Sequence, residues 1–231
     1  EAMNEPKVDP EGYGHVFGNP AGGFMSLICF TNGALALEEI RRTYNLSWEA
    51  VEASLARTPP GNNGNMMLPY FTHETTPLVQ TPGPVYEGNP AFREGKDVDA
   101  VVRAVVEAQA LRLRLHSQWI DPSPHVIRVT GGTSVNTAVC QILADVFNTR
   151  LERLETGNSA GLGAAMRAAQ RISGATWEHL SGAFCRTESE HVVQNNPAHS
   201  DVYRTMLSAF AAFAERDQQK RSTCRNDGAI A

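Results

Sequence analysis

The sequence predicts an α/β fold in which a mixed β-sheet is flanked by helices. Three observations support this class. Two short strand patterns around a Gly-rich turn come before the first helical pattern. Strand and helix patterns then alternate along the second half of the chain, as they do in βαβ units. One strand pattern, HVIRVT at 125–130, ends in Gly131-Gly132 and leads directly into a helical pattern.

The two early strands are predicted at 14–20, GHVFGNP, and 24–30, FMSLICF, on either side of Gly22-Gly23. The second run is apolar almost throughout, which predicts that both of its faces are covered. Helical patterns follow at 32–44 and at 47–56. Ser47 suits the N-cap position of the latter helix.

Residues 58–96 carry many Pro, Gly, Asn and Thr residues and contain one apolar island, MMLPYF. We expect a long irregular loop here, and loops of this length are usually functional or disordered. A strong helix should begin at Asp97, because apolar residues recur at spacings of three and four. That stripe consists of Val101, Val105, Ala108, Leu111 and Leu115.

After the strand at 125–130, a helix is predicted at 136–147, a short strand at 151–155 and an Ala-rich helix at 160–173. The small residues of the Ala-rich helix predict close packing against its neighbours. After a loop, Ser200 could cap a last amphipathic helix. Its apolar stripe comprises Val202, Met206, Phe210 and Phe213, and the polar tail from 218 is expected to be loose.

Composition excludes several classes of protein. The chain has 231 residues, is 42% hydrophobic and 19% charged, and has a net charge of −5. These values are typical of a globular protein and give no basic surface for nucleic acid or an anionic membrane. No apolar run approaches the roughly 20 residues of a spanning helix, and no signal peptide is visible, so a cytoplasmic location is expected. Reduced thiols are favoured over disulfides or zinc for Cys29, Cys140, Cys185 and Cys224.

The glycine motifs decide between types of ligand site. The chain has no match to the G-x-x-x-x-G-K-[ST] phosphate loop, and the stretch from Gly161 places Met166 where a dinucleotide fingerprint needs Gly or Ala. Gly131-Gly132 is different because it follows a strand at its carboxyl end, where open α/β sheets bind ligands. Glycines there let main chain approach a ligand, and the next helix offers unpaired N–H groups. The amide of Asn136 could meet an adenine edge or a ribose, although a purely structural turn remains an alternative.

Other polar residues have less specific interpretations. His73-Glu74 is predicted as a solvated loop pair rather than an acid/base couple. Asp145 is predicted at the surface or at the end of its helix. Trp48, near a helix start, is expected to be a partly buried anchor, although a flat aromatic side chain could also stack on a base.

The motifs resemble those of a known family. GGTSVNTAVCQILADVF at 131–147, followed by LERLETGNSAGLGAAMRAA at 151–169, is similar to the C-terminal domain of carbohydrate kinases with the FGGY signature. GHVFGNPAGGFMSLICFTNGALALEEIR at 14–41 and GNNGNMMLPYFTHETTP at 61–77 resemble the longer, eukaryote-like xylulokinase branch, as does the closing VYRTMLSAFAAF.

The resemblance implies a ribonuclease-H-like, actin-like ATPase domain that binds ATP or ADP. It implies that Gly131, Gly132 and Thr133 lie against the nucleotide, that Asn136 hydrogen-bonds to it and that Trp48 flanks the adenine. The implied reaction is the Mg²⁺-assisted transfer of the ATP γ-phosphate to the 5-hydroxyl of D-xylulose. The alternatives are another substrate of the family, such as ribulose or glycerol, and a non-catalytic, actin-like nucleotide-binding module.

The resemblance also implies a division of the protein. Residues 1–217 correspond to the C-terminal kinase domain and 218–231 to a polar tail. The sugar-binding residues and the general-base aspartate of the family belong to an N-terminal half that lies upstream, so none is assigned here and this chain alone is expected to be inactive. A missing first strand would leave an unpaired sheet edge and favour a homodimer.

Overall fold

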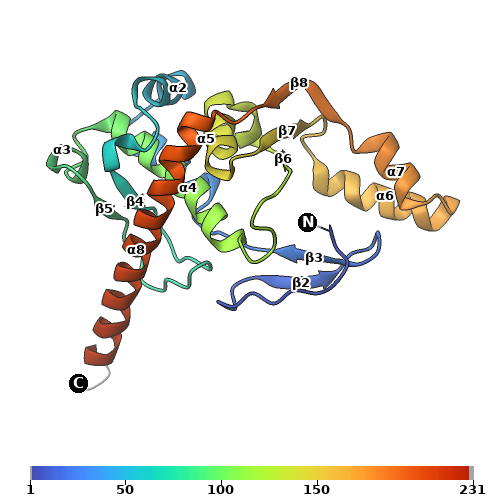
Figure 1. Ribbon diagram of the computed structural model, residues 1–231, viewed down its shortest axis with the longest axis horizontal. Helices are drawn as coiled ribbons and strands as arrows, with labels where there is room; N and C mark the ends of the chain where they lie inside the picture. The colour runs from blue at the N-terminus through green and yellow to red at the C-terminus, as the bar shows by residue number, and fades with distance from the viewer. Residues whose placement is uncertain (1, 229–231) are drawn as a thin grey trace. The chain divides into compact units, whose positions relative to one another are not determined.

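The computed structural model describes residues 2–228, apart from the side chains of residues 2, 133, 189 and 224–228 (Figure 1). The chain divides into two compact units. The first unit consists of residues 1–28 and 118–197, and the second of residues 29–117 and 198–231.

The first unit begins with a small antiparallel sheet in the order β1-β3-β2, formed by β1 (Ala2–Met3), β2 (His15–Gly18) and β3 (Phe24–Leu27). The turn between β2 and β3 needs glycine, since Gly23 has a φ of +72° and a Cβ there would lie 2.5 Å from the Met3 carbonyl oxygen. Both predicted strands are therefore present. The prediction that the second is covered on both faces is wrong, because Met25 and Leu27 are 40% and 47% exposed. A sheet of three such short strands is too small to be enclosed on both sides.

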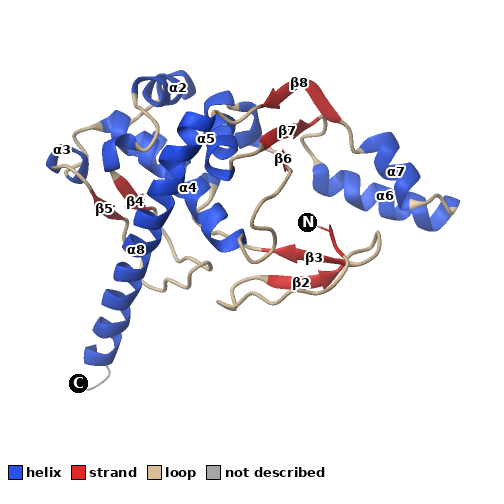
Figure 2. Ribbon diagram, viewed as in Figure 1, coloured by secondary structure: helices blue, strands red, loops and turns tan. Residues whose placement is uncertain are grey.

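A second, mixed sheet in the same unit has the order β6-β7-β8 (Figure 2). Strands β6 (Val126–Val129) and β7 (Arg150–Leu154) are parallel, and the helix α5 (Thr137–Phe147) connects them. Strand β8 (Thr187–Val193) pairs antiparallel with β7. The apolar side chains of α5 pack on this sheet in a cluster formed by Cys140, Ala144, Leu151, Ile127, Val129, Leu143 and Val193.

Two helices, α6 (Ser159–Ser173) and α7 (Trp177–Phe184), lie between β7 and β8 along the chain. The prediction that the Ala-rich helix packs closely against its neighbours is wrong. In α6 only Met166 is buried, and no heavy atom lies within 4 Å of a Cβ built at Gly163. The loop predicted before the last helix contains α7 and β8 instead, and neither segment carries a strong periodic pattern.

The second unit is built around α4 (Val98–Ser117), against which α1 (Ala34–Thr43), α2 (Trp48–Arg57) and β4 (Met66–Leu68) pack. The predicted stripe is buried except for the half-buried Leu115, and three charged residues of α4 are buried as well, namely Arg103, Glu107 and Arg112. These charges are buried because each has an oppositely charged partner.

The segment predicted as irregular carries more structure than expected. It contains the short helix η1 (Asn62–Gly64), β4, β5 (Val85–Glu87) and α3 (Pro90–Arg93), and β4 pairs antiparallel with β5. Asn side chains in this segment form hydrogen bonds to backbone groups that no β-ladder pairs. The side-chain Nδ2 of Asn62, for example, donates to the carbonyl of Ala100 (2.8 Å) and to that of Asn65 (3.2 Å).

The last helix, α8 (Pro197–Gly228), begins three residues before the predicted cap Ser200 and continues beyond 217. The tail expected to be loose is thus helical as far as residue 228. Arg221 accounts for this order: it pairs with Asp217 and donates to the carbonyls of Thr81 (2.7 Å) and Gly83 (3.1 Å). Within the described part of the chain, no helix has both the length and the apolar character needed to cross a membrane.

Candidate functional site

The predicted ligand corner lies at the carboxyl end of β6. After Thr130 the chain turns at Gly131, whose φ of +88° lies in the left-handed region that glycine adopts without strain. A short helix, η2 (Gly132–Val135), follows and is closed by a hydrogen bond from the Ser134 amide to the Gly131 carbonyl (3.1 Å). The Gly-Gly pair therefore forms the turn from strand to helix that the sequence predicts.

The main chain at this corner is bare. No heavy atom lies within 4 Å of a Cβ built at Gly131 or at Gly132. Gly132 is exposed, and its backbone conformation lies outside the left-handed region. A flat ligand could therefore approach the two glycines from the side where a Cβ would point, while the Gly131 carbonyl accepts a hydrogen bond from the Ser134 hydroxyl (2.6 Å).

Asn136 marks the start of α5. Its side-chain oxygen accepts a hydrogen bond from the Val139 amide (3.0 Å), and the residue is buried. This N-cap satisfies one of the orphan donors of the helix, and no acidic side chain of the first turn offsets the positive helix end. The structure thus assigns Asn136 a capping role that sequence analysis missed, although Asn is a preferred N-cap residue. Its predicted contact with a nucleotide remains a prediction.

A second loop lies at the same sheet edge, because β6 and β7 are parallel. The Thr130 hydroxyl donates to the Thr156 carbonyl (2.9 Å) and ties the two loops together. The second loop continues through Gly157 to Asn158, which caps α6 by accepting from the Gly161 amide (2.9 Å). This loop was not predicted as part of the site, although Gly157 and Asn158 stand before a helix as Gly132 and Asn136 do in the first loop.

Two further predicted site residues are Thr133, which belongs to η2 at this corner, and Trp48. The side chain of Thr133 lies outside the described part of the structure. Trp48 belongs to the second unit, whereas the glycine corner belongs to the first. Trp48 is the first residue of α2, whose N-cap is Ser47, and its side chain is 49% exposed. Its place beside an adenine remains a prediction.

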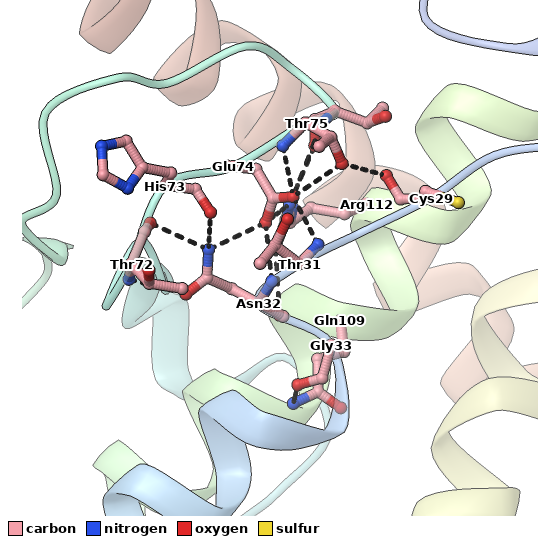
Figure 3. Close-up of polar contacts among 11 residues, drawn as sticks. Cys29, Thr31, Asn32, Gly33, Thr72, His73, Glu74, Thr75, Gln109 and Arg112 are labelled. Atoms are coloured by element: carbon pink, nitrogen blue, oxygen red, sulfur yellow. Dashed lines mark hydrogen bonds and ion pairs between the residues drawn. The ribbon is translucent and has the colours of Figure 1, made fainter.

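Glu74 is not the solvated loop residue that the sequence predicted. It is 1% exposed and forms an ion pair with Arg112, which is equally enclosed (Figure 3). Its carboxylate also accepts from the amides of Thr31 (2.7 Å) and Asn32 (3.1 Å). Burial alone would raise the pKa of Glu74, but Arg112 and these hydrogen bonds outweigh it and lower the pKa below its ordinary value.

This cluster fixes the start of α1 rather than forming an acid/base couple. The Asn32 side chain exchanges hydrogen bonds with the backbone of Thr72 (3.0 and 3.1 Å), and Gln109 of α4 donates to the Gly33 carbonyl (2.9 Å) (Figure 3). Asn32 and Gly33, which precede α1, are therefore held by the loop at Thr72 and by α4. His73 contributes its backbone carbonyl, which accepts a hydrogen bond from the side-chain Nδ2 of Asn32 (3.3 Å).

Asp145 lies near the end of α5 as predicted, but it is buried, not at the surface. It accepts from the Gln141 side chain (2.8 Å) and the Asn196 amide (2.7 Å). Among the described residues, Cys29, Cys140 and Cys185 are free thiols, and burial raises the pKa of Cys140. No group of three or more His, Cys, Asp or Glu side chains that could hold a metal ion occurs in the part of the chain that the structure describes.

Comparison with known proteins identifies the family. Residues 5–171 match the model of the C-terminal domain of the FGGY family of carbohydrate kinases. The chain belongs to this family. The resemblance inferred from the Gly-Gly helix and the Ala-rich helix is therefore confirmed.

Curated relatives of this FGGY kinase domain include the xylulose kinases of Mus musculus and Rattus norvegicus. The mouse protein is 31% identical over 217 residues, and the match covers 88% of this chain and 38% of that protein. The rat protein is 32% identical over 211 residues, with coverage of 88% and 39%. The chain thus spans about two fifths of the length of these relatives.

Solved structures confirm the predicted fold class, the ribonuclease-H-like domain of actin-like ATPases. The xylulose kinase of Lactobacillus acidophilus superposes with a TM-score of 0.82 at 19% identity, covering 93% of this FGGY domain and 44% of that chain. A Plasmodium falciparum glycerol kinase solved with ADP gives a TM-score of 0.68 at 15% identity, with coverage of 91% and 43%. At these identities the likeness establishes the fold alone.

Proposed function

We propose that this chain is the adenosine-binding part of a sugar kinase that transfers the γ-phosphate of ATP to the 5-hydroxyl of D-xylulose. Membership of the FGGY family and the relatives named xylulose kinase support the reaction and the sugar. The single observation that carries the proposal is the bare main chain at Gly131-Gly132, where β6 turns into α5.

In this proposal the corner receives the nucleoside end of the nucleotide. Gly131 and Gly132 present peptide groups to a flat base, and Thr133 borders the same surface. The uncompensated positive end of α5 favours an anionic ligand nearby. Asn136 contributes in two ways, as the cap that fixes the helix start and as a hydrogen-bonding partner of the nucleotide. Trp48 supplies a face for the adenine.

Phosphoryl transfer depends on positioning and on electrostatic stabilisation of the phosphates. Mg²⁺ is usually held by one or two carboxylates together with substrate phosphates. We assign none of the described residues to the metal. We place the general base and the sugar contacts in the part of the full-length relatives that this chain does not match. By itself the chain then binds ADP weakly and phosphorylates nothing.

The test compares ADP binding to the chain and to two matched variants by titration calorimetry. Gly132→Val puts a branched side chain at the corner, where a Cβ has no heavy atom within 4 Å, and Gly18→Val makes the same change on β2, where a Cβ likewise has none. We expect Gly132→Val to abolish ADP binding and Gly18→Val to leave it unchanged. Equal affinities for all three proteins, or no ADP binding by the unmodified chain, would overturn the proposed pocket.

The reaction is tested by ADP release on the longest natural protein that carries this chain, with D-xylulose, ribulose and glycerol offered in parallel. Preference for D-xylulose supports the proposal, and preference for either competitor contradicts the proposed sugar. Absence of turnover with all three would favour a non-catalytic nucleotide-binding module. Turnover by the 231-residue chain alone would contradict the division of labour proposed here.

A further inference from the structure

The Gly131-Gly132 turn follows a strand that has a single neighbour. In the sheet order β6-β7-β8, β6 pairs with β7 alone among the described strands, whereas β7 pairs on both sides. The backbone pairing of β6 with β7 ends at Val129, opposite Arg153. Thr130 and the turn therefore lie beyond the last pair of the ladder, on the less constrained of these two strands.

Thr130 continues the connection between the two strands with its side chain. Its hydroxyl donates to the carbonyl of Thr156 (2.9 Å), which lies in the loop after β7. That loop is itself held, because the Thr156 hydroxyl accepts from the Asn158 amide (3.2 Å) and Asn158 caps α6. The Thr130 bond thus ties the turn to the loop of the central strand, at the point where backbone pairing has ended.

The helix side of the turn is held by separate bonds. The Gly131 carbonyl accepts from both the amide (3.1 Å) and the hydroxyl (2.6 Å) of Ser134. The Ser134 carbonyl in turn accepts from the Cys140 thiol of α5 (3.4 Å), although a thiol is a weak donor. The turn is therefore attached to α5 on one side and, through Thr130, to the neighbouring loop on the other.

The Thr130 hydroxyl is suited to a local role rather than to a contribution to global stability. Thr130 is exposed, so water can replace the Thr156 carbonyl as the partner of its hydroxyl, and exposed substitutions of this kind usually change the free energy of unfolding little. What the bond restricts is the position of one loop relative to the other. A loop that already has its bound conformation loses less entropy on binding, which raises affinity for the ligand.

We propose that Thr130 is a positioning residue for the nucleotide, because its hydroxyl anchors the Gly131-Gly132 turn to the loop at Thr156. The inference rests on the proposed function, since it concerns the same corner, and all of its residues belong to the first unit. It gives the loop after β7, for which no ligand contact was predicted, a part in nucleotide affinity.

The experiment compares three variants of the chain. Thr130→Val keeps the branched shape and removes the hydroxyl, whereas Thr130→Ser keeps the hydroxyl. Thr187→Val is the control, because Thr187 is a half-buried residue of β8 in the same unit, and its side chain takes part in none of the described hydrogen bonds. Each protein is titrated with ADP by calorimetry and unfolded with urea. Amide hydrogen exchange of the ligand-free proteins is followed by NMR at Ser134 and Asn158, whose amides donate within the two loops.

We expect Thr130→Val to weaken ADP binding about two- to fivefold, the effect of one hydrogen bond of modest net strength. In the free protein it should speed amide exchange at Ser134 and Asn158, while the urea midpoint remains that of the unmodified chain. Thr130→Ser should restore both the ADP affinity and the slow exchange. Thr187→Val should alter neither of them.

Three results would overturn the inference. The first is normal ADP affinity of Thr130→Val. The second is an equal loss of affinity in Thr130→Val and Thr130→Ser, which would mean that the hydroxyl is not what position 130 contributes. The third is unchanged amide exchange in free Thr130→Val despite weaker ADP binding, which would make the hydroxyl a direct ligand contact and not an anchor of the turn.

The role of Thr130 and the proposed function can fail separately. If Gly132→Val abolishes ADP binding while Thr130→Val binds normally, the proposed function stands and only the role of Thr130 fails. No ADP binding by the unmodified chain would overturn both.

Discussion

Arg103 and Glu107 lie one helical turn apart on α4, and the Nε of the first is 2.8 Å from Oε1 of the second in the core of the second unit. The same carboxylate oxygen accepts from the Tyr203 hydroxyl of α8 (2.8 Å) and from the Gly61 amide (2.9 Å). Arg103 also donates to the Leu55 carbonyl of α2 (2.9 Å). Two charged residues thus connect two further helices and a loop to α4.

Glu107→Ala should destabilise the chain by ~3–5 kcal/mol, because it leaves the buried Arg103 guanidinium without a carboxylate. Glu107→Gln keeps an acceptor for the Gly61 amide and should cost less. Urea unfolding followed by far-UV circular dichroism measures both. Glu39→Ala, which breaks the exposed pair with Arg42 on α1, is the control and should leave the unfolding midpoint unchanged. Equal effects of Glu107→Ala and Glu39→Ala would contradict the structural role of the buried pair.

Glu74 should make stability depend on acid pH. Because its pKa is lower in the folded chain than its ordinary value of 4.5, the carboxylate contributes stability above that pH. The contribution is lost as the pH falls through the folded-state pKa. Glu74→Gln should therefore be less stable than the unmodified chain at neutral pH, with Arg112 left buried and uncompensated.

The measurement is urea unfolding of both proteins over a series of pH values. The difference between their free energies of unfolding should be constant above pH 4.5 and should shrink below it. A difference that stays the same down to strongly acid pH would show that Glu74 does not titrate as the buried partner of Arg112.

Local patterns predicted the parts of the fold whose signals are contained in neighbouring residues. The turn at Gly131, the cap at Ser47 and the stripe of α4 depend on residues a few positions apart, and all are present. Buried charges were missed because their partners are distant: Arg103 reaches the Tyr203 hydroxyl across 100 residues (3.0 Å). Hydropathy assigns such residues to the surface unless the partner is known.

The candidate site was only partly predictable for a related reason. A strand followed by two glycines and a helix predicts a turn with exposed main chain, because the two glycines carry no side chains. The neighbouring loop at Thr156 was not selected because its place at the same edge follows from the parallel pairing of β6 and β7. Pairing is a property of the sheet and cannot be read from either strand alone.

Asn136 allows its capping role to be separated from its proposed nucleotide contact. Asn136→Ala should cost about 1 kcal/mol of stability through loss of the cap. Asn136→Ser keeps a capping oxygen but removes the side-chain NH2 group, so it should be more stable than Asn136→Ala. If the amide contacts the nucleotide, ADP affinity should fall in both variants, as measured by calorimetry. Full ADP affinity in Asn136→Ser would contradict the proposed contact between the Asn136 amide and the nucleotide.

Gly61 and Gly64 form a pair that separates backbone strain from lack of space. Both have left-handed backbones, with φ of +76° and +80°, so alanine at either position costs about 1–2 kcal/mol. A Cβ at Gly61 would also lie 2.6 Å from Cγ1 of Val202, whereas a Cβ at Gly64 has no heavy atom within 4 Å. Gly61→Ala should therefore push α8 from the loop and weaken the Gly61–Glu107 hydrogen bond.

We accordingly expect Gly61→Ala to lower the free energy of unfolding by more than Gly64→Ala does, with the excess arising from contact with α8. Val202→Ala removes the methyl group that a Cβ at Gly61 would meet, so in the double variant Gly61→Ala/Val202→Ala the cost of Gly61→Ala should fall toward that of Gly64→Ala. A double-variant cycle by urea unfolding tests this coupling. Strict additivity of the two changes would mean that the left-handed backbone alone, and not the packing of α8, requires glycine at position 61.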